Sequence, residues 1–115
     1  MIKMAKYKIA DSSTLFVEDS KSFPEKDFTT KENITNQNGD MKFKLKLMAE
    51  EDGRLEHYEF IYWGKENPLE GIAAMSPVTV KDIELGVGTY RDQNGANRKW
   101  WNFYCSGVES MTKKA

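Results

Sequence analysis

The stretch Met41-Lys42-Phe43-Lys44-Leu45-Lys46-Leu47 decides the fold class of this chain. Apolar and lysine side chains alternate along it, which is the period-2 pattern of a β-strand with one buried face. Glu51-Asp52-Gly53-Arg54 follows, and its Asp-Gly pair is a strong signal for a tight turn. The segment Leu55 to Trp63 is rich in the aromatic and β-branched residues that strands favour. We therefore predict a β-hairpin over residues 41–63.

Further strands are expected on both sides of this hairpin. A first strand falls within residues 4–17, and Val78-Thr79-Val80 opens another after a Ser-Pro breaker. In the strand that begins at Val78, the alternation of apolar and polar residues shifts by one residue before Ile83. Such a shift predicts a bulge or a sharp bend. Asn94-Gly95 is a turn signal, and we expect a last long strand over Lys99–Val108 behind it.

Two segments of the chain do not read as strands. Pro68–Met75 predicts one short helix, with Asn67 as its N-cap and the proline at the first helical position. Residues 18–40 are polar and rich in turn-forming residues, so they predict a long loop. We expect Phe23 and Phe28 to be the aromatic anchors of that loop.

The order of these elements predicts an all-β fold. The predicted elements are a strand, a hairpin, a short helix and a further bent hairpin. This is the order of an OB-fold-like, five-stranded Greek-key barrel with one short helix. A β-sandwich or an SH3-like barrel remains an alternative, because the number of strands does not determine whether the sheet closes. With 115 residues, the chain is predicted to form a single domain, 1–115.

Composition narrows the classes of function. Hydrophobic residues make up 39% and charged residues 30%, as in soluble globular proteins, and no apolar run approaches the roughly 20 residues that span a bilayer. The basic start lacks an apolar segment behind it, so no secretory signal is expected. A single cysteine, Cys105, excludes an internal disulfide, and we expect a cytoplasmic protein, in the host cytoplasm if the chain is phage-encoded.

Charge is distributed unevenly along the chain. The net charge is only −1, which argues against strong binding of a polyanion by the molecule as a whole. Residues 1–48 carry nine Lys or Arg against seven Asp or Glu, and residues 86–115 carry five against two. Residues 49–85 carry nine acids against three bases. A fold that brings the two ends together would therefore have a basic face.

Three motifs in the second half resemble those of the bacterial and phage single-stranded DNA-binding proteins. These are Tyr62-Trp63-Gly64-Lys65, Ser76-Pro77-Val78-Thr79-Val80 and Gly88-Thr89-Tyr90-Arg91-Asp92-Gln93-Asn94-Gly95. The resemblance covers roughly residues 55–108 and is closest to a divergent phage protein. It implies an OB-fold, binding of single-stranded DNA during replication and recombination, and a homo-oligomer, either a dimer or a tetramer.

The resemblance also implies roles for individual residues. Trp63 matches an aromatic residue that stacks on a base, and Tyr90 lies near a second stacking position. His57 stands where the family often has a tryptophan, and Tyr58 is next to it. The family usually ends in an acidic tail that recruits other proteins, whereas residues 110–115 are not acidic. We therefore expect any replication or recombination protein to dock on the folded domain.

The last predicted strand divides its aromatic side chains between two faces. Trp101 and Phe103 share one face with Cys105 and are expected in the core. Trp100 and Tyr104 would then point toward solvent or a ligand. Stacking of Trp63 and Trp100 on unpaired bases is the preferred interpretation, because aromatic rings beside cations bind single strands without regard to sequence. A dimer contact through the same rings is the alternative.

Seven cations are candidates for contacts to phosphate. Lys42, Lys44 and Lys46 form a regular stripe, which is equally typical of a solvated strand edge that prevents aggregation. The remaining four lie beside the aromatic segments and are the stronger candidates: Lys65, Arg91, Arg98 and Lys99.

No catalytic constellation is evident. His57, the single histidine, lacks the converging ligands of a metal site, and Cys105 is more typical of a small core residue than of a nucleophile. Gly86-Val87-Gly88 is not a dinucleotide motif. We predict a non-enzymatic protein without metal or cofactor that binds single-stranded DNA with little sequence preference. A β-barrel that binds proteins, such as a phage structural adaptor, and an OB domain that binds RNA are the alternatives.

Overall fold

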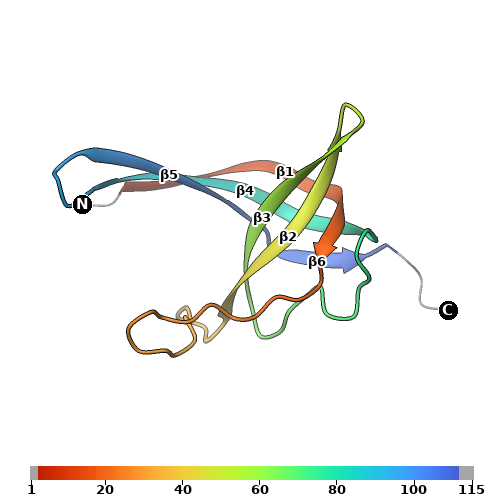
Figure 1. The fold of residues 1–115 in the computed structure, drawn as a ribbon, viewed down its shortest axis with the longest axis horizontal. Helices are drawn as coiled ribbons and strands as arrows, with labels where there is room; N and C mark the ends of the chain where they lie inside the picture. The colour runs from red at the N-terminus through yellow and green to blue at the C-terminus, as the bar shows by residue number, and fades with distance from the viewer. Residues whose placement is uncertain (1–2, 112–115) are drawn as a thin grey trace.

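A computed structural model describes residues 3–111 as an all-β structure. Its strands are β1 (Lys3–Asp19), β2 (Met41–Glu51), β3 (Arg54–Gly64), β4 (Pro77–Arg91), β5 (Asn97–Tyr104) and β6 (Gly107–Ser110). The first five close into a ring in the order β1-β2-β3-β5-β4, and β4 returns to β1 (Figure 1). β3 and β5 run parallel, while the other neighbours run antiparallel. This closed barrel confirms the predicted OB-fold-like class.

The central hairpin is confirmed, with its turn at the predicted Asp-Gly pair. β2 and β3 pair from Met41 opposite Gly64 to Glu51 opposite Arg54, without a shift. Asp52 and Gly53 form the two-residue turn with φ angles of 50° and 76°. Two positive φ angles match the twist of a hairpin, which is why an Asp-Gly pair occurs here.

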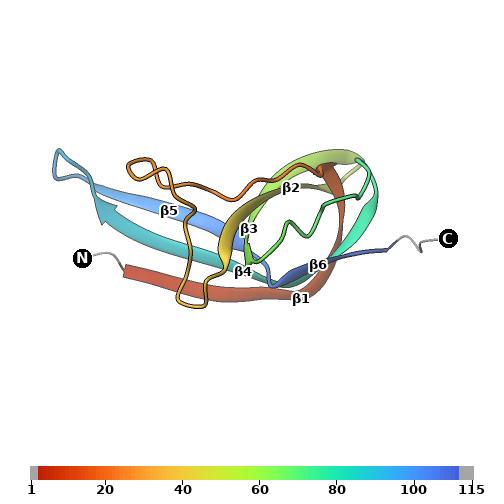
Figure 2. The same ribbon diagram turned by 90° about the horizontal axis from the view of Figure 1, so that it is seen from below.

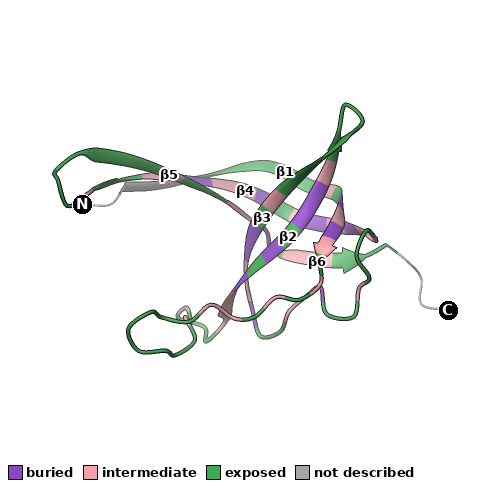
Figure 3. Ribbon diagram, in the orientation of Figure 1, coloured by how far each residue is buried: buried purple, intermediate pink, exposed green. Residues whose placement is uncertain are grey.

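The core lies inside the barrel, as Figure 3 shows. Phe43, Leu45 and Leu47 point inward from β2, while Lys44 and Lys46 between them are exposed, so the predicted alternation is correct. Leu69, from the connection between β3 and β4, is fully buried in the same cluster. The remaining fully buried side chains are Val17, Val78 and Val80.

The predicted helix over residues 68–75 is absent, and this prediction was wrong. The Asn67 side chain accepts a hydrogen bond from the Leu69 amide at 3.0 Å, as an N-cap would. However, the chain then makes only isolated turns, because Gly71 has a φ of 80° and Met75 a φ of 69°. These left-handed residues end the turn before a helix can propagate.

The predicted bend in β4 is confirmed at Asp82. Val78 and Val80 are buried, and burial then resumes at Ile83, with Asp82 between them at a φ of 51°. Opposite this point the β1–β4 register shifts between Lys8 and Ala10, so the extra residue of the bulge lies in β1.

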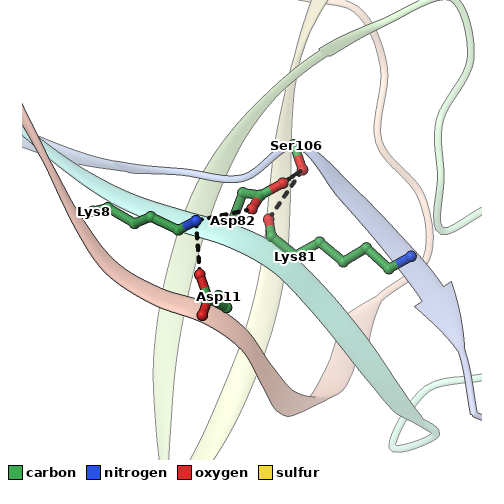
Figure 4. A network of polar contacts seen from close by, with 5 residues as sticks. All are labelled: Lys8, Asp11, Lys81, Asp82 and Ser106. Atoms are coloured by element: carbon green, nitrogen blue, oxygen red, sulfur yellow. Dashed lines mark hydrogen bonds and ion pairs between the residues drawn. The ribbon is translucent and has the colours of Figure 1, made fainter.

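Polar contacts hold the bend in place (Figure 4). The Ser106 hydroxyl donates to the Asp82 carboxylate at 2.5 Å, and the Ser106 amide donates to the Lys81 carbonyl at 3.0 Å. The Lys8 ammonium lies 2.7 Å from Asp11 and 3.5 Å from Asp82. The Ser106 hydroxyl, followed by Lys8, lowers the pKa of Asp82. The Asp82 carboxylate thus contacts both Lys8, beside the bulge in β1, and Ser106, in the break before β6.

Beyond the bend, three strands leave the barrel as an arm. The first half of β1, the second half of β4 and most of β5 extend together to one side (Figures 1 and 2). The molecule measures 54 × 36 × 21 Å, and its radius of gyration of 15.7 Å exceeds the roughly 13 Å of a compact domain of this length. Residues in the arm are mainly exposed or half-buried (Figure 3).

Two further predictions need correction. The last strand, predicted over residues 99–108, is two strands, because Cys105 and Ser106 break it opposite the bend in β4. Phe23 and Phe28 do not anchor the 18–40 loop: their side chains are 80% and 90% exposed. The loop is held instead by its own backbone hydrogen bonds to β2.

Some expectations concern residues at the chain ends. Residues 112–115, which belong to the segment compared with an acidic tail, lie outside the described residues, as do residues 1–2. Within residues 3–111, no helix has the length and apolar character needed to cross a membrane.

Candidate nucleic-acid interface

The register of the arm determines which side chains share a face. Ala5, Val87 and Trp101 lie directly opposite one another on β1, β4 and β5. Side chains in register on neighbouring strands point to the same side of a sheet. These three residues therefore share the inner face, which continues into the barrel. Trp100 and Tyr104 alternate with Trp101 and point to the outer face.

A groove of about 700 Å³ runs along the inner face of the arm. Its lining is mainly apolar and includes Ala5, Leu85, Val87, Lys99, Trp101 and Phe103. Trp101 is 63% exposed here, so its predicted place in the core was wrong. The arm has left the barrel at this point, and no second layer of structure covers the ring within the described residues.

The groove continues toward the barrel as an aromatic surface. Phe103 is at its centre, with ring centroids 5.3 Å from Trp101 and 5.7 Å from Tyr58, both edge to face. Two further hollows of about 270 Å³ adjoin it, and both include Tyr58 and Phe103. We call this surface, formed by Tyr58, Phe103, Trp101 and the groove, the aromatic trough.

Opposite charges lie at the two ends of the aromatic trough. Lys99 lines the groove near the tip of the arm, and Arg91 ends β4 close by. Both are exposed, and neither has an ion-pair partner within the described part of the chain. The β2–β3 hairpin on the other side is acidic. Its charged side chains over 50–59 are Glu50, Glu51, Asp52, Arg54, Glu56 and Glu59.

Two of the predicted stacking residues lie on the outer face of the arm, where each ring packs over a glycine. Trp100 lies over Gly88, and Tyr104 lies over Gly86. Both rings are half-buried in this way, and the Lys6 ammonium covers the Tyr104 ring at 4.4 Å from its centroid. These rings therefore have less free surface than Trp101.

The tip of the arm holds Tyr90 and Arg98, which are paired across the β4–β5 ladder. Tyr90 is 44% exposed. Arg98 donates to Asp92 at 2.9 Å, and the Ala96 and Asn94 amides donate to the same side chain. The Arg98 guanidinium, followed by these amides, lowers the pKa of Asp92. Arg98 thus closes the turn, and its charge is partly neutralised.

The lysine stripe lies on the outer face of the barrel, away from the aromatic trough. Lys42 faces Trp63 across the β2–β3 ladder, and Trp63 is half-buried. Glu25 forms ion pairs with Lys42 and Lys44, so two of the three lysines have internal partners. Lys46 has none among residues 3–111.

Lys65, a further candidate for phosphate contact, also has partners within the protein. The Lys65 ammonium donates to the Asn38 carbonyl at 2.9 Å and lies 3.2 Å from Asp40, so it holds the 18–40 loop against the end of β3.

Two residues of β3 face opposite ways. His57 points outward and contacts Glu18 of β1, where it forms an ion pair when protonated. Tyr58 points inward, and its hydroxyl donates to Glu51 at 2.6 Å, which raises the pKa of the phenol. Tyr58 therefore presents its ring, and not its hydroxyl, to the aromatic trough.

Two further observations concern nucleophilic catalysis and metal binding. Burial raises the pKa of Cys105 to about 12, so this thiol is not a nucleophile at neutral pH. Within residues 3–111, no three side chains of His, Cys, Asp or Glu converge in a way that could hold a metal ion.

Sequence reasoning missed the inner face as a contact surface. Alternation along β5 correctly places Trp101 and Phe103 together, but it does not show that the barrel ends between them. The one signal in the sequence was the pair Trp100-Trp101, because two consecutive tryptophans on a strand cannot both face one core.

The chain matches no protein-family model, and no curated protein is significantly similar to it.

Proposed function

We propose that this protein binds single-stranded DNA without strong sequence preference and protects it during phage DNA replication and recombination. The observation that carries the proposal is Trp101, which is 63% exposed in a groove of about 700 Å³ beside Lys99, a cation without an ion-pair partner among residues 3–111. A free aromatic face next to a cation is what an unstacked nucleotide requires.

Stacking would supply most of the affinity. Base–aromatic stacking contributes about 1–3 kcal/mol per base and does not depend on which base is present. The contact between Trp101 and Phe103 holds the indole in place, so little side-chain freedom is lost when a base stacks on it. Tyr58 extends the same surface toward the barrel and offers a second stacking position.

Electrostatics would set the path of the strand. Lys99 and Arg91 attract phosphates to the arm, whereas the acidic β2–β3 hairpin repels them. We therefore expect the backbone to follow the arm, with bases directed into the aromatic trough. Because the net charge is only −1, affinity depends on stacking more than is usual, yet it falls as salt concentration rises.

The resemblance over residues 55–108 supports the same function and adds finer proposals. These are a phage origin, a homo-oligomeric assembly, action in the host cytoplasm, and docking of replication or recombination proteins on the folded domain. The apolar lining of the groove favours one competing function, a barrel that contacts another protein through the aromatic trough.

A titration of intrinsic tryptophan fluorescence with poly-dT at low salt tests the proposal. We expect quenching, reversal by added salt, and weaker binding of Trp101→Ala. The matched control is Phe28→Ala, which removes an exposed ring that does not line the groove. If poly-dT neither quenches the fluorescence nor changes the anisotropy of a labelled dT oligonucleotide, the DNA function is wrong. Competition by an oligo-U strand distinguishes an RNA-binding protein.

A further inference from the structure

One carboxylate forms ion pairs with two lysines on the outer face of the barrel. The side chain of Glu25 lies 2.9 Å from the Lys44 ammonium and 3.2 Å from the Lys42 ammonium. Both lysines belong to the outward stripe of β2, and Lys42 faces Trp63 across the ladder. Without Glu25, these side chains would form a paired cationic site beside an aromatic ring.

The backbone places Glu25 in this position. Its amide donates to the Lys42 carbonyl at 2.8 Å, and its carbonyl accepts from the Ile34 amide at 2.8 Å. The Lys42 amide in turn donates to the Ile34 carbonyl at 3.3 Å. The 18–40 loop therefore adds to the free edge of β2 and directs the carboxylate onto the lysines.

The contact is ordered but accessible. The side chains of Glu25, Lys42 and Lys44 are 27%, 24% and 50% exposed. Partial burial raises the pKa of Glu25, but hydrogen bonds from Lys44 and Lys42 outweigh it and hold the pKa below the usual range. Glu25 is thus fully ionised at neutral pH.

We propose that Glu25 occupies the place of a phosphate and masks a second contact site for the DNA backbone, formed by Lys42 and Lys44. Two ammonium groups that converge on carboxylate oxygens present the same donors that phosphate oxygens accept. The backbone bonds of Glu25 do not restrain its carboxylate, so the side chain turns aside while the loop stays in place. Partly exposed ion pairs are weak, which makes this exchange feasible.

The inference rests on the proposed function, because the phosphates come from a bound single strand. It predicts that the two lysines contribute little in the wild-type protein and contribute fully once the carboxylate is removed. Each phosphate contact steepens the dependence of log K on log salt by about 0.7 for single strands, so two contacts add about 1.4.

Four variants test the masking. Glu25→Gln keeps the shape and removes the charge, and we expect it to bind a dT oligonucleotide at least tenfold more tightly at low salt, with the steeper slope. Glu32→Gln removes an equal charge from the same loop, at a side chain without an ion pair in the described residues, and should change little. Lys42→Gln/Lys44→Gln should leave wild-type binding almost unchanged. The fourth variant, which combines Glu25→Gln with both lysine substitutions, should lose the gain of Glu25→Gln.

The outcomes separate this inference from the proposed function. If wild type binds and Trp101→Ala binds weakly, but Glu25→Gln behaves as Glu32→Gln does, only the masking is wrong. The masking is also wrong if the paired lysine substitution weakens wild type as much as it weakens Glu25→Gln. If wild type fails to bind while Glu25→Gln binds, the masking holds and the aromatic trough is not the site. If no variant binds, both proposals are overturned.

Discussion

The indole of Trp100 lies over Gly88, its partner across the β4–β5 ladder. A Cβ atom on Gly88 would stand 2.5 Å from the Cε2 and Cζ2 atoms of that ring. The Tyr104 ring likewise lies over Gly86, which is two residues along β4 from its register partner Glu84. The glycines thus provide flat sites on which the outer rings pack, and aromatic side chains over strand glycines are a known way to stabilise such positions. This packing covers part of the outer face of the arm.

Gly88→Ala is therefore expected to destabilise the protein. The added methyl displaces the Trp100 ring, and such overpacking costs about 1–3 kcal/mol. The measurement is the free energy of unfolding from urea titration followed by circular dichroism. Gly107→Ala is the matched control, because a Cβ there meets nothing within 4 Å, and its effect should stay within about 0.5 kcal/mol. Equal losses in the two variants would contradict the packing argument.

The two adjacent tryptophans should separate stability from binding. Trp101→Ala removes an exposed ring from the aromatic trough, and it should weaken poly-dT binding by about 1–3 kcal/mol, or about fivefold to a hundredfold, without loss of stability. Trp100→Ala uncovers Gly88 and should instead lower the free energy of unfolding. Fluorescence titration and urea denaturation of both variants check this. If instead Trp100→Ala weakens binding and Trp101→Ala lowers stability, the binding site lies on the outer face of the arm.

Backbone strain at the bend should make Asp82 intolerant of branched side chains. Its φ of 51° is accessible to Asp and Asn but costly for β-branched residues. Asp82→Val should thus destabilise the protein by about 1–3 kcal/mol. Asp82→Asn keeps the conformation and an acceptor for Ser106, so it should retain most of the stability. A Val variant as stable as the Asn variant, by thermal melting, would show that the bend is not strained.

Asp92 should contribute to the dependence of stability on pH. Arg98 and the turn amides lower its pKa in the folded protein below the ordinary value of about 3.9. A depressed pKa means stability that is present above the unfolded-state pKa and is lost as pH falls through the folded-state pKa. Asp92→Asn should be less stable than wild type at neutral pH, and the difference should disappear in acid. Urea titrations at both pH values check this, and a difference that persists in acid would refute it.

Cys105 should be unreactive in the native protein. Burial raises its pKa to about 12, and the side chain is 8% exposed, so neither a thiolate nor an open path is present at neutral pH. Ellman's reagent should label it only after urea unfolds the barrel. Fast labelling without denaturant would mean that the last turn before β6 opens readily.

Much of the barrel could be predicted from the residue patterns within single strands. The alternation over Met41–Leu47 and the Asp-Gly turn predicted the central hairpin, and the phase shift before Ile83 predicted the bend. The helix over residues 68–75 was predicted wrongly, because the sequence pattern does not show that Gly71 and Met75 adopt left-handed φ angles. Phe23 and Phe28 were expected to anchor the loop, since sequence alone does not show that backbone pairing with β2 already holds it.

The sequence by itself determined which side chains of each strand share a face, because alternation in a strand is a local property of the backbone. It also determined the hairpin turns, since their positive φ angles favour Asp and Gly. Only the tertiary structure decided which faces are covered. Trp101 and Phe103 share a face and are in contact, yet Trp101 is exposed in the arm while Phe103 packs against the barrel core. Burial depends on what lies opposite a strand, and the distant Ser106 and Lys8 side chains help to hold the bend beyond which the arm leaves the barrel.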